Sequence, residues 1–503
     1  MNPLADALAA PLADRKDPVI HRPDGSEMSG ADLYALSAQI AHVLLRAGVA
    51  PGDRVMVQTA KSVEALALYL ACLRAGALFL PLNTAYTSTE LAYFLEDANP
   101  TVVVCSPQAE GDLVSMAAAS ATVLTLAADG SGTLMQQAQS APPSFDTVAR
   151  AADDLAVILY TSGTTGRSKG AMLSHNNLLS NAISLAEAWH FTSDDTLLHA
   201  LPIFHAHGLF VATNVLLKAG GRMIFLPGFD VDTVLENLPK ATTMMGVPTF
   251  YTRLLADPRF TREVSAHMRL FISGSAPLLA ETHRAFEART GHRILERYGM
   301  TETTMNTSNP YDGERRAGTV GFPLPGVEAR ITDAQTGQLV EDGSPGLLEV
   351  RGPNVFRGYW RMPEKTAEEF RDDGFFITGD IASTDADGYI TIVGRAKDLI
   401  ISGGYNVYPK EVETQIDLLD GVLESAVIGV PHADFGEAVV AVVVQSGSRS
   451  IDEQTIIAAS KDTLANFKCP KAVFFLDALP RNTMGKVQKN ELRKMFAGTF
   501  KNG

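Results

Sequence analysis

Glycine, hydroxyl and cationic residues are concentrated in one stretch, Tyr160–Gly170, which reads Tyr-Thr-Ser-Gly-Thr-Thr-Gly-Arg-Ser-Lys-Gly. Glycines let the backbone turn tightly and expose its N–H groups. These N–H groups and the hydroxyls can donate hydrogen bonds to phosphate oxygens, and the lysine adds a positive charge. The composition suits a polyphosphate-binding loop, although the spacing is not that of a Walker A motif. A flexible surface loop is the alternative, and spacing alone favours neither.

The segment Arg297–Glu302 offers further groups that suit a nucleotide. Tyr298 has a flat face for adenine, Thr301 has a hydroxyl for phosphate, and Glu302 has a hard oxygen ligand for Mg²⁺. A tyrosine and a glutamate at this spacing are unremarkable by themselves. Their significance depends on their place and order in the chain.

Asp380 closes a predicted strand, and its carboxylate can accept hydrogen bonds from both ribose hydroxyls, as acidic residues do in other nucleotide-binding folds. A hairpin is predicted next, with its turn at residues 385–388. The return strand brings Arg395 back towards Asp380, so we expect both side chains to meet one ribose. The alternative for each residue is an ordinary charge at a turn or a sheet edge.

Three side chains are candidates for a substrate pocket. His205 and His207 lie in a predicted loop between an apolar strand and an apolar helix, where a histidine is more often structural than catalytic. Arg253 is flanked by apolar residues in a helix that Pro248 opens. Its stem could pack while its head reaches water. If its guanidinium is buried instead, it needs an anionic partner, and this interpretation predicts a dicarboxylate substrate.

The stretch Tyr160–Gly170 resembles the phosphate-binding loop of the adenylate-forming superfamily, which comprises acyl-CoA synthetases, peptide adenylation domains and firefly-type luciferases. The other blocks of that superfamily follow once each and in order, up to Pro480–Lys489. The resemblance implies that ATP activates a carboxylate as an adenylate and that CoA then accepts the acyl group. It implies ATP contacts by Thr161, Ser162, Gly163, Thr164, Thr165, Gly166, Lys169, Ser275, Ala276, Pro277, Glu296, Arg297, Tyr298, Gly299, Thr301, Asp380 and Arg395.

The resemblance also implies roles beyond ATP binding. Lys486 matches the catalytic lysine of the adenylation step, and Lys397 matches the hinge between the two domains. Gly403 and Gly404 match the segment past which the pantetheine arm of CoA is threaded, and Glu302 would bind Mg²⁺. The acyl pocket would be lined by Ala206, His207, Arg253, Ser275 and Met305, with His207 also counted as catalytic.

Within the superfamily, the segments Phe204–Phe210, Phe250–Leu255 and Tyr298–Pro310 together resemble the malonyl-CoA synthetases. This resemblance implies formation of malonyl-CoA, AMP and pyrophosphate from malonate, ATP and CoA. Ala206 stands where a threonine is familiar, so we expect room for methylmalonate. The alternatives are a medium-chain or aromatic acyl-CoA ligase, a stand-alone enzyme that loads a carrier protein, and a nucleotide-binding regulator without catalysis.

These residues need a large α/β scaffold. Alternating strands and helices in the first third of the chain predict parallel sheets covered by helices, except at residues 116–144, which we expect to be a weakly specified surface region. We expect a large N-terminal domain, residues 1–396, with a smaller β subdomain. A small, mobile α+β domain would follow at residues 397–503.

Composition limits the partners. The chain of 503 residues carries a net charge of −15, which argues against a nucleic-acid surface. It has no apolar stretch of about 20 residues that could span a membrane, and its first residues do not resemble a signal peptide, so we expect a cytoplasmic protein. The expected partners are small molecules, with a lysine acetyltransferase or deacetylase acting on Lys486 as a further possibility. Three cysteines show no metal-binding spacing.

Overall fold

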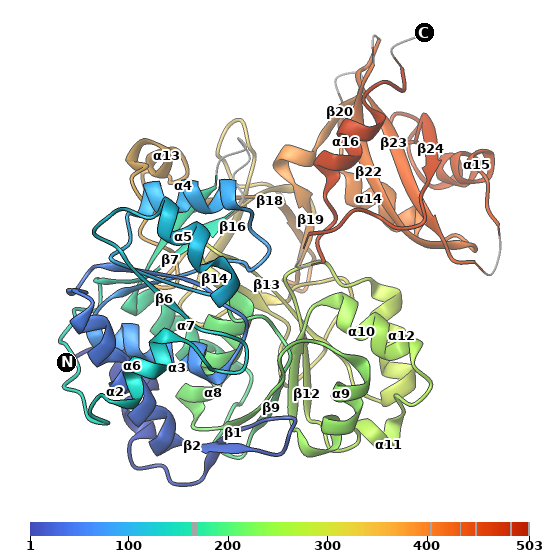
Figure 1. Ribbon diagram of the computed structural model, residues 1–503. Coiled ribbons are helices and arrows are strands. Elements are labelled where there is room, and N and C mark those ends of the chain that lie inside the picture. Colours follow the sequence, from blue (N-terminus) through green and yellow to red (C-terminus); the bar gives the residue numbers. More distant parts are fainter. Residues whose placement is uncertain (162–167, 403–404, 433, 448–449, 483–484, 501–503) are drawn as a thin grey trace. The chain divides into compact units, whose positions relative to one another are not determined.

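The computed structural model describes residues 1–161, 168–402, 405–432, 434–447, 450–482 and 485–500 (Figure 1). The chain forms two compact units. The first comprises Met1–Gly318, Phe322–Glu328 and Arg351–Phe376, and the second comprises Thr319–Gly321, Ala329–Val350 and Ile377–Gly503. The predicted α/β fold with a smaller C-terminal α+β part is confirmed. The domain boundary before Lys397 stays a prediction.

A six-stranded sheet in the first unit is parallel except at one edge, where β7 and β8 are antiparallel. One face packs on α4 (Ser88–Ala98) through a core that includes Phe94, Val103 and Ile158. In sheet order, the strands are β6 (Thr122–Thr125), β5 (Val102–Cys105), β3 (Arg54–Gln58), β4 (Leu78–Pro81), β7 (Leu155–Thr161) and β8 (Lys169–Ser174).

Local sequence explains where the helix α3 (Val63–Ala75) begins and ends. The Ser62 hydroxyl accepts a hydrogen bond of 3.1 Å from the Ala65 N–H, which satisfies one of the unpaired donors of the first turn. Gly76 ends the helix with φ of 72°, in the left-handed conformation that glycine adopts readily. Helix α2 (Gly30–Arg46) packs against α3. A capping serine before an apolar helical pattern and a glycine after it predict the bounds of α3 from the sequence.

The structure contains regular elements in this region that the sequence does not indicate. After β7, the strand β8 precedes the helix α7 (His175–Ala188). Residues 116–144, which we expect to be a weakly specified surface region, contain β6 and the helix α6 (Thr133–Gln139). Elements of four to seven residues are too short to give a clear periodic signal, and here parallel pairing of β6 with β5 decides the outcome.

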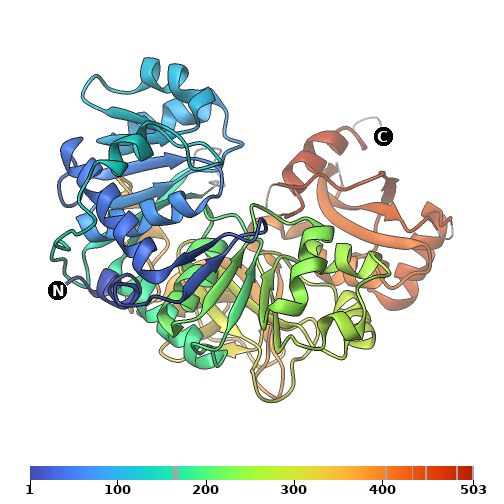
Figure 2. The ribbon, with the colours of Figure 1, turned by 60° about the horizontal axis from the view of Figure 1, so that its bottom comes forward.

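A nine-stranded sheet forms the rest of the first unit, with its central strands parallel. Figure 2 shows the N-terminal hairpin (dark blue) beside the green strands at one edge of this sheet. In sheet order, the strands are β15 (Phe322–Pro323), β14 (Thr304–Ser308), β13 (Leu295–Met300), β12 (Leu270–Ser273), β11 (Thr243–Gly246), β9 (Thr196–His199), β10 (Arg222–Phe225), β1 (Pro18–His21) and β2 (Glu27–Ser29).

Helices pack on this sheet around a core that includes Tyr251, Phe271 and Phe286. The remaining helices of the first unit are α1 (Pro3–Leu8), α5 (Glu110–Met116), α8 (Asn214–Ala219), α9 (Val231–Asn237), α10 (Pro248–Ala256), α11 (Arg262–Ser265), α12 (Ala280–Thr290) and α13 (Pro363–Glu368).

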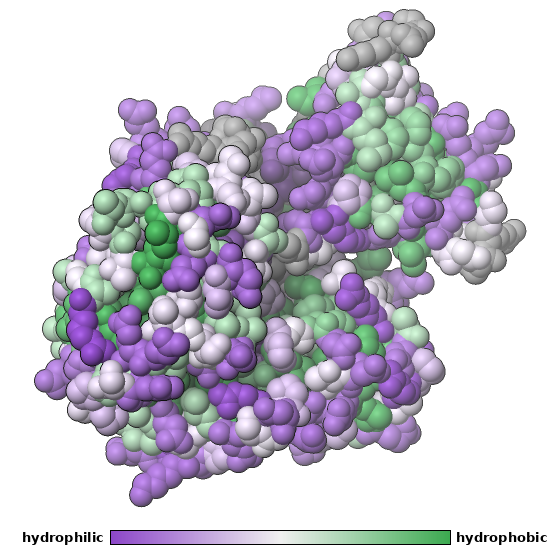
Figure 3. All heavy atoms as spheres, in the orientation of Figure 1, coloured by the Kyte–Doolittle hydropathy of each residue, from purple (hydrophilic) through white to green (hydrophobic). Residues whose placement is uncertain are grey.

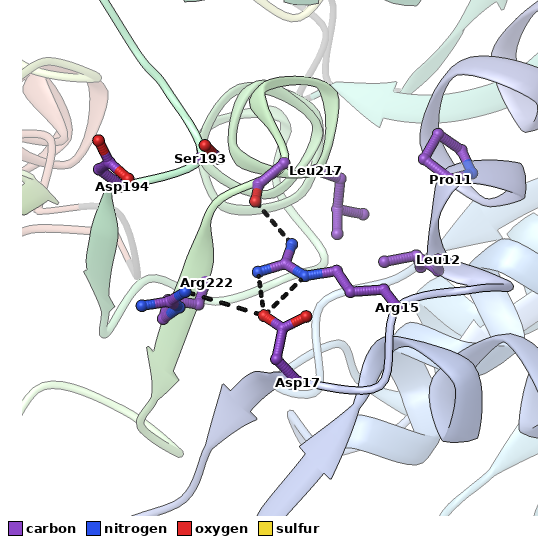
Figure 4. Close-up of a pocket in the computed structure, with 9 residues that line it drawn as sticks. Pro11, Leu12, Arg15, Asp17, Ser193, Asp194, Leu217 and Arg222 are labelled. Atoms are coloured by element: carbon purple, nitrogen blue, oxygen red, sulfur yellow. Dashed lines mark hydrogen bonds and ion pairs between the residues drawn. The ribbon is translucent and has the colours of Figure 1, made fainter.

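Arg15 ties the N-terminal segment to the end of α8 (Figure 4). Its Nη1 donates to the carbonyl oxygens of Gly220, at 2.6 Å, and Gly221, at 2.8 Å. Asp17 accepts from Nε and Nη2 of Arg15 and also lies 3.8 Å from Arg222. Asp17 therefore pairs with both Arg15 and Arg222, and these contacts have a structural role.

The second unit contains two sheets, described here by themselves. In sheet order, the four-stranded sheet consists of β16 (Glu328–Thr332), β17 (Gly346–Arg351), β18 (Phe376–Thr384) and β19 (Ile390–Arg395). The other sheet consists of β21 (Tyr405–Val407), β20 (Ile400–Ser402), β23 (Gly436–Gln445) and β22 (Val422–His432), with β24 (Ala472–Phe475) paired to β23. Its helices are α14 (Pro409–Ile416), α15 (Glu453–Thr463) and α16 (Lys489–Phe496).

Hydrophobic side chains reach the surface of the second unit (Figure 3), where Tyr405 is 61% exposed and stacks on Phe467.

Within the described part of the chain, no helix combines the length and the apolar character needed to cross a membrane.

Candidate active site

His207, Ser275 and Arg297 form a polar cluster inside the first unit. Nδ1 of His207 lies 3.1 Å from Oγ of Ser275, and His207 and Arg297 are each only 3% exposed. The three residues come from different elements, because His207 begins a π-helical segment (His207–Thr213), Ser275 follows β12, and Arg297 lies in β13. The fold thus brings together three predicted site residues that are far apart in the sequence.

The backbone around His207 has little freedom. A methyl group on Gly208 would lie 2.0 Å from the carbonyl oxygen of Pro202, so only glycine fits there. The Gly208 carbonyl accepts a 2.9 Å hydrogen bond from the Thr213 hydroxyl and also lies 2.9 Å from Nε2 of His199. These contacts hold the first turn of the π-helical segment, a conformation often found at functional sites.

Ser275 adopts φ of 70°, a left-handed conformation that is uncommon for a residue with a side chain. Its hydroxyl nevertheless faces His207. Such conformations cost of order 1–3 kcal/mol and persist where the surrounding structure determines them. The turn after β12 is held in part by Glu296, whose Oε1 accepts from the Leu278 N–H at 3.0 Å.

The charges in this cluster are unusual. Burial, and then the charge of Arg297, lower the pKa of His207 well below its ordinary value, so its imidazole is neutral at neutral pH. Burial also lowers the pKa of Arg297 to about 9. Among the described residues, Nε and Nη2 of Arg297 and Nε2 of His207 have no hydrogen-bond partner. A buried cation with unpaired donors is costly, and a carboxylate would satisfy it.

Arg253 is exposed, so the structure does not bear out the burial on which its predicted role depends. Helix α10 turns Tyr251 and Leu254 towards the core, and the intervening Arg253 therefore faces outwards. The interpretation of Arg253 as an amphipathic side chain that reaches water fits the structure. The buried guanidinium near the expected acyl pocket belongs to Arg297 instead.

The β13–β14 hairpin positions further predicted residues. Tyr298, Gly299 and Thr301 are half-buried, whereas Glu302 and Met305 are buried. Gly299 is needed for close packing, since a methyl group on it would lie 1.9 Å from the Thr304 carbonyl oxygen. Of the other residues predicted to contact ATP or the acyl group, Ala206 and Ala276 are half-buried and Pro277 is exposed.

Two residues that the sequence analysis missed, Tyr359 and Glu369, connect the predicted phosphate lysine to the predicted metal ligand. Nζ of Lys169 lies 3.0 Å from Oε1 of Glu369. The Tyr359 hydroxyl lies 2.7 Å from Oε2 of Glu369 and 3.0 Å from Oε1 of Glu302. Lys169 and Glu369 are 200 residues apart, and no spacing pattern in the sequence indicates the contact.

In the second unit, Asp380 and Arg395 are direct partners across the β18–β19 ladder, as predicted, with Nε 2.8 Å from Oδ1. Lys397 is exposed in a short 3₁₀ turn, Ala396–Asp398. Lys486 is also exposed, and its backbone N–H donates to Oδ1 of Asn482 at 2.9 Å.

Part of the predicted site lies outside the described residues. Thr161 and Lys169 are described and pair directly as the last partners of the β7–β8 ladder. The predicted residues without a structural description are Ser162, Gly163, Thr164, Thr165, Gly166, Gly403 and Gly404.

The residues present fit a phosphate-bound Mg²⁺. In the part of the chain that can be searched, no three His, Cys, Asp or Glu side chains are arranged to hold a metal ion by themselves. Mg²⁺ in nucleotide sites is typically held by one or two carboxylates together with substrate phosphates and water. The single buried carboxylate of Glu302 matches that donor set.

Comparison with known proteins agrees with this geometry. The protein is 59% identical to the ATP-bound MatB of Rhodopseudomonas palustris, over 99% of this chain and all of that one, with a TM-score of 0.96. A malonate–CoA ligase of Arabidopsis thaliana is 36% identical over 89% of this chain and 78% of that protein. A feruloyl-CoA synthase of an Amycolatopsis species is also 36% identical, over 94% and 95%.

Two family models match the chain. The AMP-binding enzyme model matches residues 10–360, and the model of the AMP-binding enzyme C-terminal domain matches residues 411–486. Together they span both the polar cluster in the first unit and the Lys486 segment in the second. The chain therefore belongs to the AMP-binding enzyme family.

Proposed function

We propose that this protein is an AMP-forming malonyl-CoA synthetase. It converts malonate, ATP and CoA into malonyl-CoA, AMP and pyrophosphate through a malonyl-adenylate, and it also accepts methylmalonate. Similarity to a malonate–CoA ligase and membership of the AMP-binding enzyme family support this activity. A feruloyl-CoA synthase is as similar to this chain as the malonate–CoA ligase is, so overall similarity does not identify the acid, and the residues of the site have to do so.

The environment of Arg297 is the observation that supports malonate as the acid substrate. Its guanidinium is buried, its Nε and Nη2 have no hydrogen-bond partner among the residues that the structure describes, and it lies near the neutral His207. The distal carboxylate of malonate supplies the missing charge and accepts two parallel hydrogen bonds from a guanidinium. A monocarboxylic acid of the same length would leave the cation buried and unpaired, which costs a few kcal/mol.

In the first step, an oxygen of the second carboxylate attacks the α-phosphorus of ATP, and the bond to the β-phosphate oxygen breaks. The difficulty is electrostatic, since an anion approaches a polyanion. Lys169 and the loop of residues 161–169 contact the departing phosphates. Lys486 bridges the attacking carboxylate and the α-phosphoryl oxygens. Mg²⁺, held by Glu302, supplies further neutralisation of phosphate charge when it is bound.

Asp380 and Arg395 hold the ribose during this step, and Tyr298 offers its ring face to the adenine. The pairing of Asp380 with Arg395 on adjacent strands supports their assignment to the ribose, because it places a hydrogen-bond acceptor and a donor side by side.

In the second step, the thiol of CoA loses its proton and attacks the acyl carbonyl, and AMP leaves. We assign the boundary between the catalytic domains to Lys397, with residues 397–503 rotating about it to withdraw Lys486 and present Gly403 and Gly404 to CoA. Hinges of this kind lie in short segments that absorb backbone rotation. The position of Lys397 in an exposed turn between β19 and β20 supports the assignment.

The test is CoA-dependent release of AMP from ATP, with malonate, methylmalonate, succinate, acetate and butyrate measured in parallel. We expect kcat/KM for malonate to exceed that for acetate or butyrate by about a hundredfold or more. Preference for a monocarboxylate or an aromatic acid would reject malonate as the substrate. AMP formation with none of a broad acid panel would reject synthetase activity.

The matched variants are Arg297→Met and Arg253→Met. Loss of malonate selectivity only in the first variant supports Arg297 as the carboxylate-binding residue. The same loss in Arg253→Met alone would return the role to Arg253.

Lys486 is exposed, which makes it accessible to a lysine acetyltransferase. Acetylation removes the positive charge that the first step requires. We therefore expect enzymatic acetylation of Lys486 to stop adenylation and deacetylation to restore it.

A further inference from the structure

Lys169 makes favourable contacts with two side chains of the protein. Besides the 3.0 Å contact with Glu369, its Nζ lies 3.9 Å from the centre of the Tyr359 ring, where an ammonium group is attracted to the π face. The Lys169 side chain is 12% exposed and that of Glu369 is 20% exposed, so water screens this pair only in part.

Glu369 is held in turn by several donors. Tyr359 lies 2.7 Å from its Oε2, and Lys365 lies 3.2 Å from its Oε1. Burial alone would raise the pKa of Glu369, but the hydrogen bonds from Tyr359 and Lys169 outweigh burial and lower it. Glu369 is therefore an anion at neutral pH that is fixed beside Lys169.

Tyr359 connects this pair to Glu302. Its side chain is 2% exposed, and its hydroxyl has one proton to donate while it faces two carboxylates. The arrangement brings the carboxylates of Glu302 and Glu369 to one hydroxyl group. Lys169 contacts Glu369 and the Tyr359 ring, so it belongs to the same cluster as Glu302, which binds Mg²⁺ at these phosphates in the proposed reaction.

A polyphosphate that reaches Lys169 has to compete with Glu369 for the same ammonium group. The competition weakens binding of every polyphosphate, including the pyrophosphate that leaves after adenylation. We propose that Glu369 is a positioning residue that competes with phosphate for Lys169 and lowers the affinity of the site for pyrophosphate. This inference rests on the proposed function, in which Lys169 contacts phosphates.

The experiment is calorimetric binding of inorganic pyrophosphate to the full-length protein, in Mg²⁺ buffer, without ATP, acid or CoA. Glu369→Gln removes the charge and keeps the shape, and we expect it to tighten pyrophosphate binding by about threefold to tenfold. Glu368→Gln is the matched control, because Glu368 is the adjacent residue and pairs at 3.0 Å with Lys365, at the surface. It should leave the dissociation constant unchanged.

A second pair of variants separates this inference from the proposed function. Lys169→Ala should weaken pyrophosphate binding, and in that background Glu369→Gln should have no further effect. If Lys169→Ala weakens pyrophosphate binding but Glu369→Gln weakens it or leaves it unchanged, the role proposed for Glu369 is overturned and the phosphate role of Lys169 stands. Unchanged binding in Lys169→Ala overturns the phosphate role of Lys169 and the inference with it. The acid specificity of the enzyme enters neither measurement.

Discussion

The guanidinium of Arg297 lies directly against the backbone of Gly274, so that a methyl group on Gly274 would be 2.4 Å from Cζ of Arg297. Glycine is required here by the close approach of the side chain. The position of the buried cation therefore depends on a residue that has no side chain of its own.

Gly274→Ala should displace Arg297 and raise KM for malonate by about tenfold or more, since overpacking in a filled interior costs roughly 1–3 kcal/mol. KM for ATP should change much less. Steady-state kinetics with each substrate varied in turn checks this. Gly228→Ala is the control, because a methyl group there meets no atom within 4 Å. Equal effects of the two substitutions would contradict the expected contact.

Acidification should destabilise the protein in part through His175. Its ring nitrogens have no hydrogen-bond partner within the described structure, and burial, followed by the charge of Arg150, lowers its pKa to about 4. The unfolded chain binds this proton near pH 6.5 but the folded chain does not, so stability is complete above pH 6.5 and falls as the pH drops towards 4. Protonation of His175 lowers the free energy of unfolding by on the order of 3 kcal/mol over this pH range.

Chemical denaturation at several pH values measures this effect, and His175→Gln should reduce the slope of the unfolding free energy between pH 6.5 and 4. A variant with the slope of the wild type would show that His175 is protonated in the folded state as readily as in the unfolded chain.

Asp380→Asn should raise KM for ATP by about tenfold, because it replaces a carboxylate by a weaker acceptor at the proposed ribose site. KM for malonate should stay within about twofold, as the two substrates contact different groups. Asp387→Asn, at the exposed turn of the same hairpin, is the control. A larger effect on malonate than on ATP would remove Asp380 from the nucleotide site.

Lys486→Ala should slow malonyl-adenylate formation by at least about a hundredfold, because charge that develops in the transition state loses its partner. Thioester formation from supplied malonyl-adenylate should be retained, and rapid-quench assays of each half-reaction separate the two. Lys494→Ala, whose side chain is 77% exposed on α16, should affect neither step. Equal loss of both half-reactions in Lys486→Ala would contradict a role confined to adenylation.

Ala206→Thr should lower kcat/KM for methylmalonate by about tenfold while malonate changes little, since a pocket resists an added methyl group by roughly 1–3 kcal/mol once its space is filled. Parallel assays with both acids measure the ratio. If the ratio is unchanged, Ala206 does not contact the carbon between the carboxylates.

Local signals in the sequence predicted much of the fold. Ser62 and Gly76 mark the two ends of α3 because capping chemistry depends on neighbouring residues only. The predicted turn at residues 385–388 brings Asp380 and Arg395 close together, while their direct pairing also depends on a register shift at Ile381, which no sequence signal indicates. The motifs around Tyr160–Gly170 and Arg297–Glu302 identified the family by their order.

Long-range packing could not be predicted in this way. The sequence neighbours of Arg253 and Arg297 do not indicate which of the two is buried, and only the tertiary structure shows that the first is exposed and the second buried. Tyr359 and Glu369 belong to no spacing pattern, and their contacts with Lys169 and Glu302 arise from chain segments that meet only in the folded protein.

The antiparallel pairing of β7 with β8 also limits which changes of chain length the protein can tolerate. Thr161 and Lys169 are paired across this ladder, so the two ends of the connecting segment are fixed to each other. Adding residues between them costs little entropy, because closure of a loop depends only weakly on its length. Deleting a single residue within β8 would instead turn every side chain on one side of the deletion to the opposite face. The fold therefore tolerates a change of length between these two residues far more readily than within β8, and between them the proposed phosphate contacts set the limit instead.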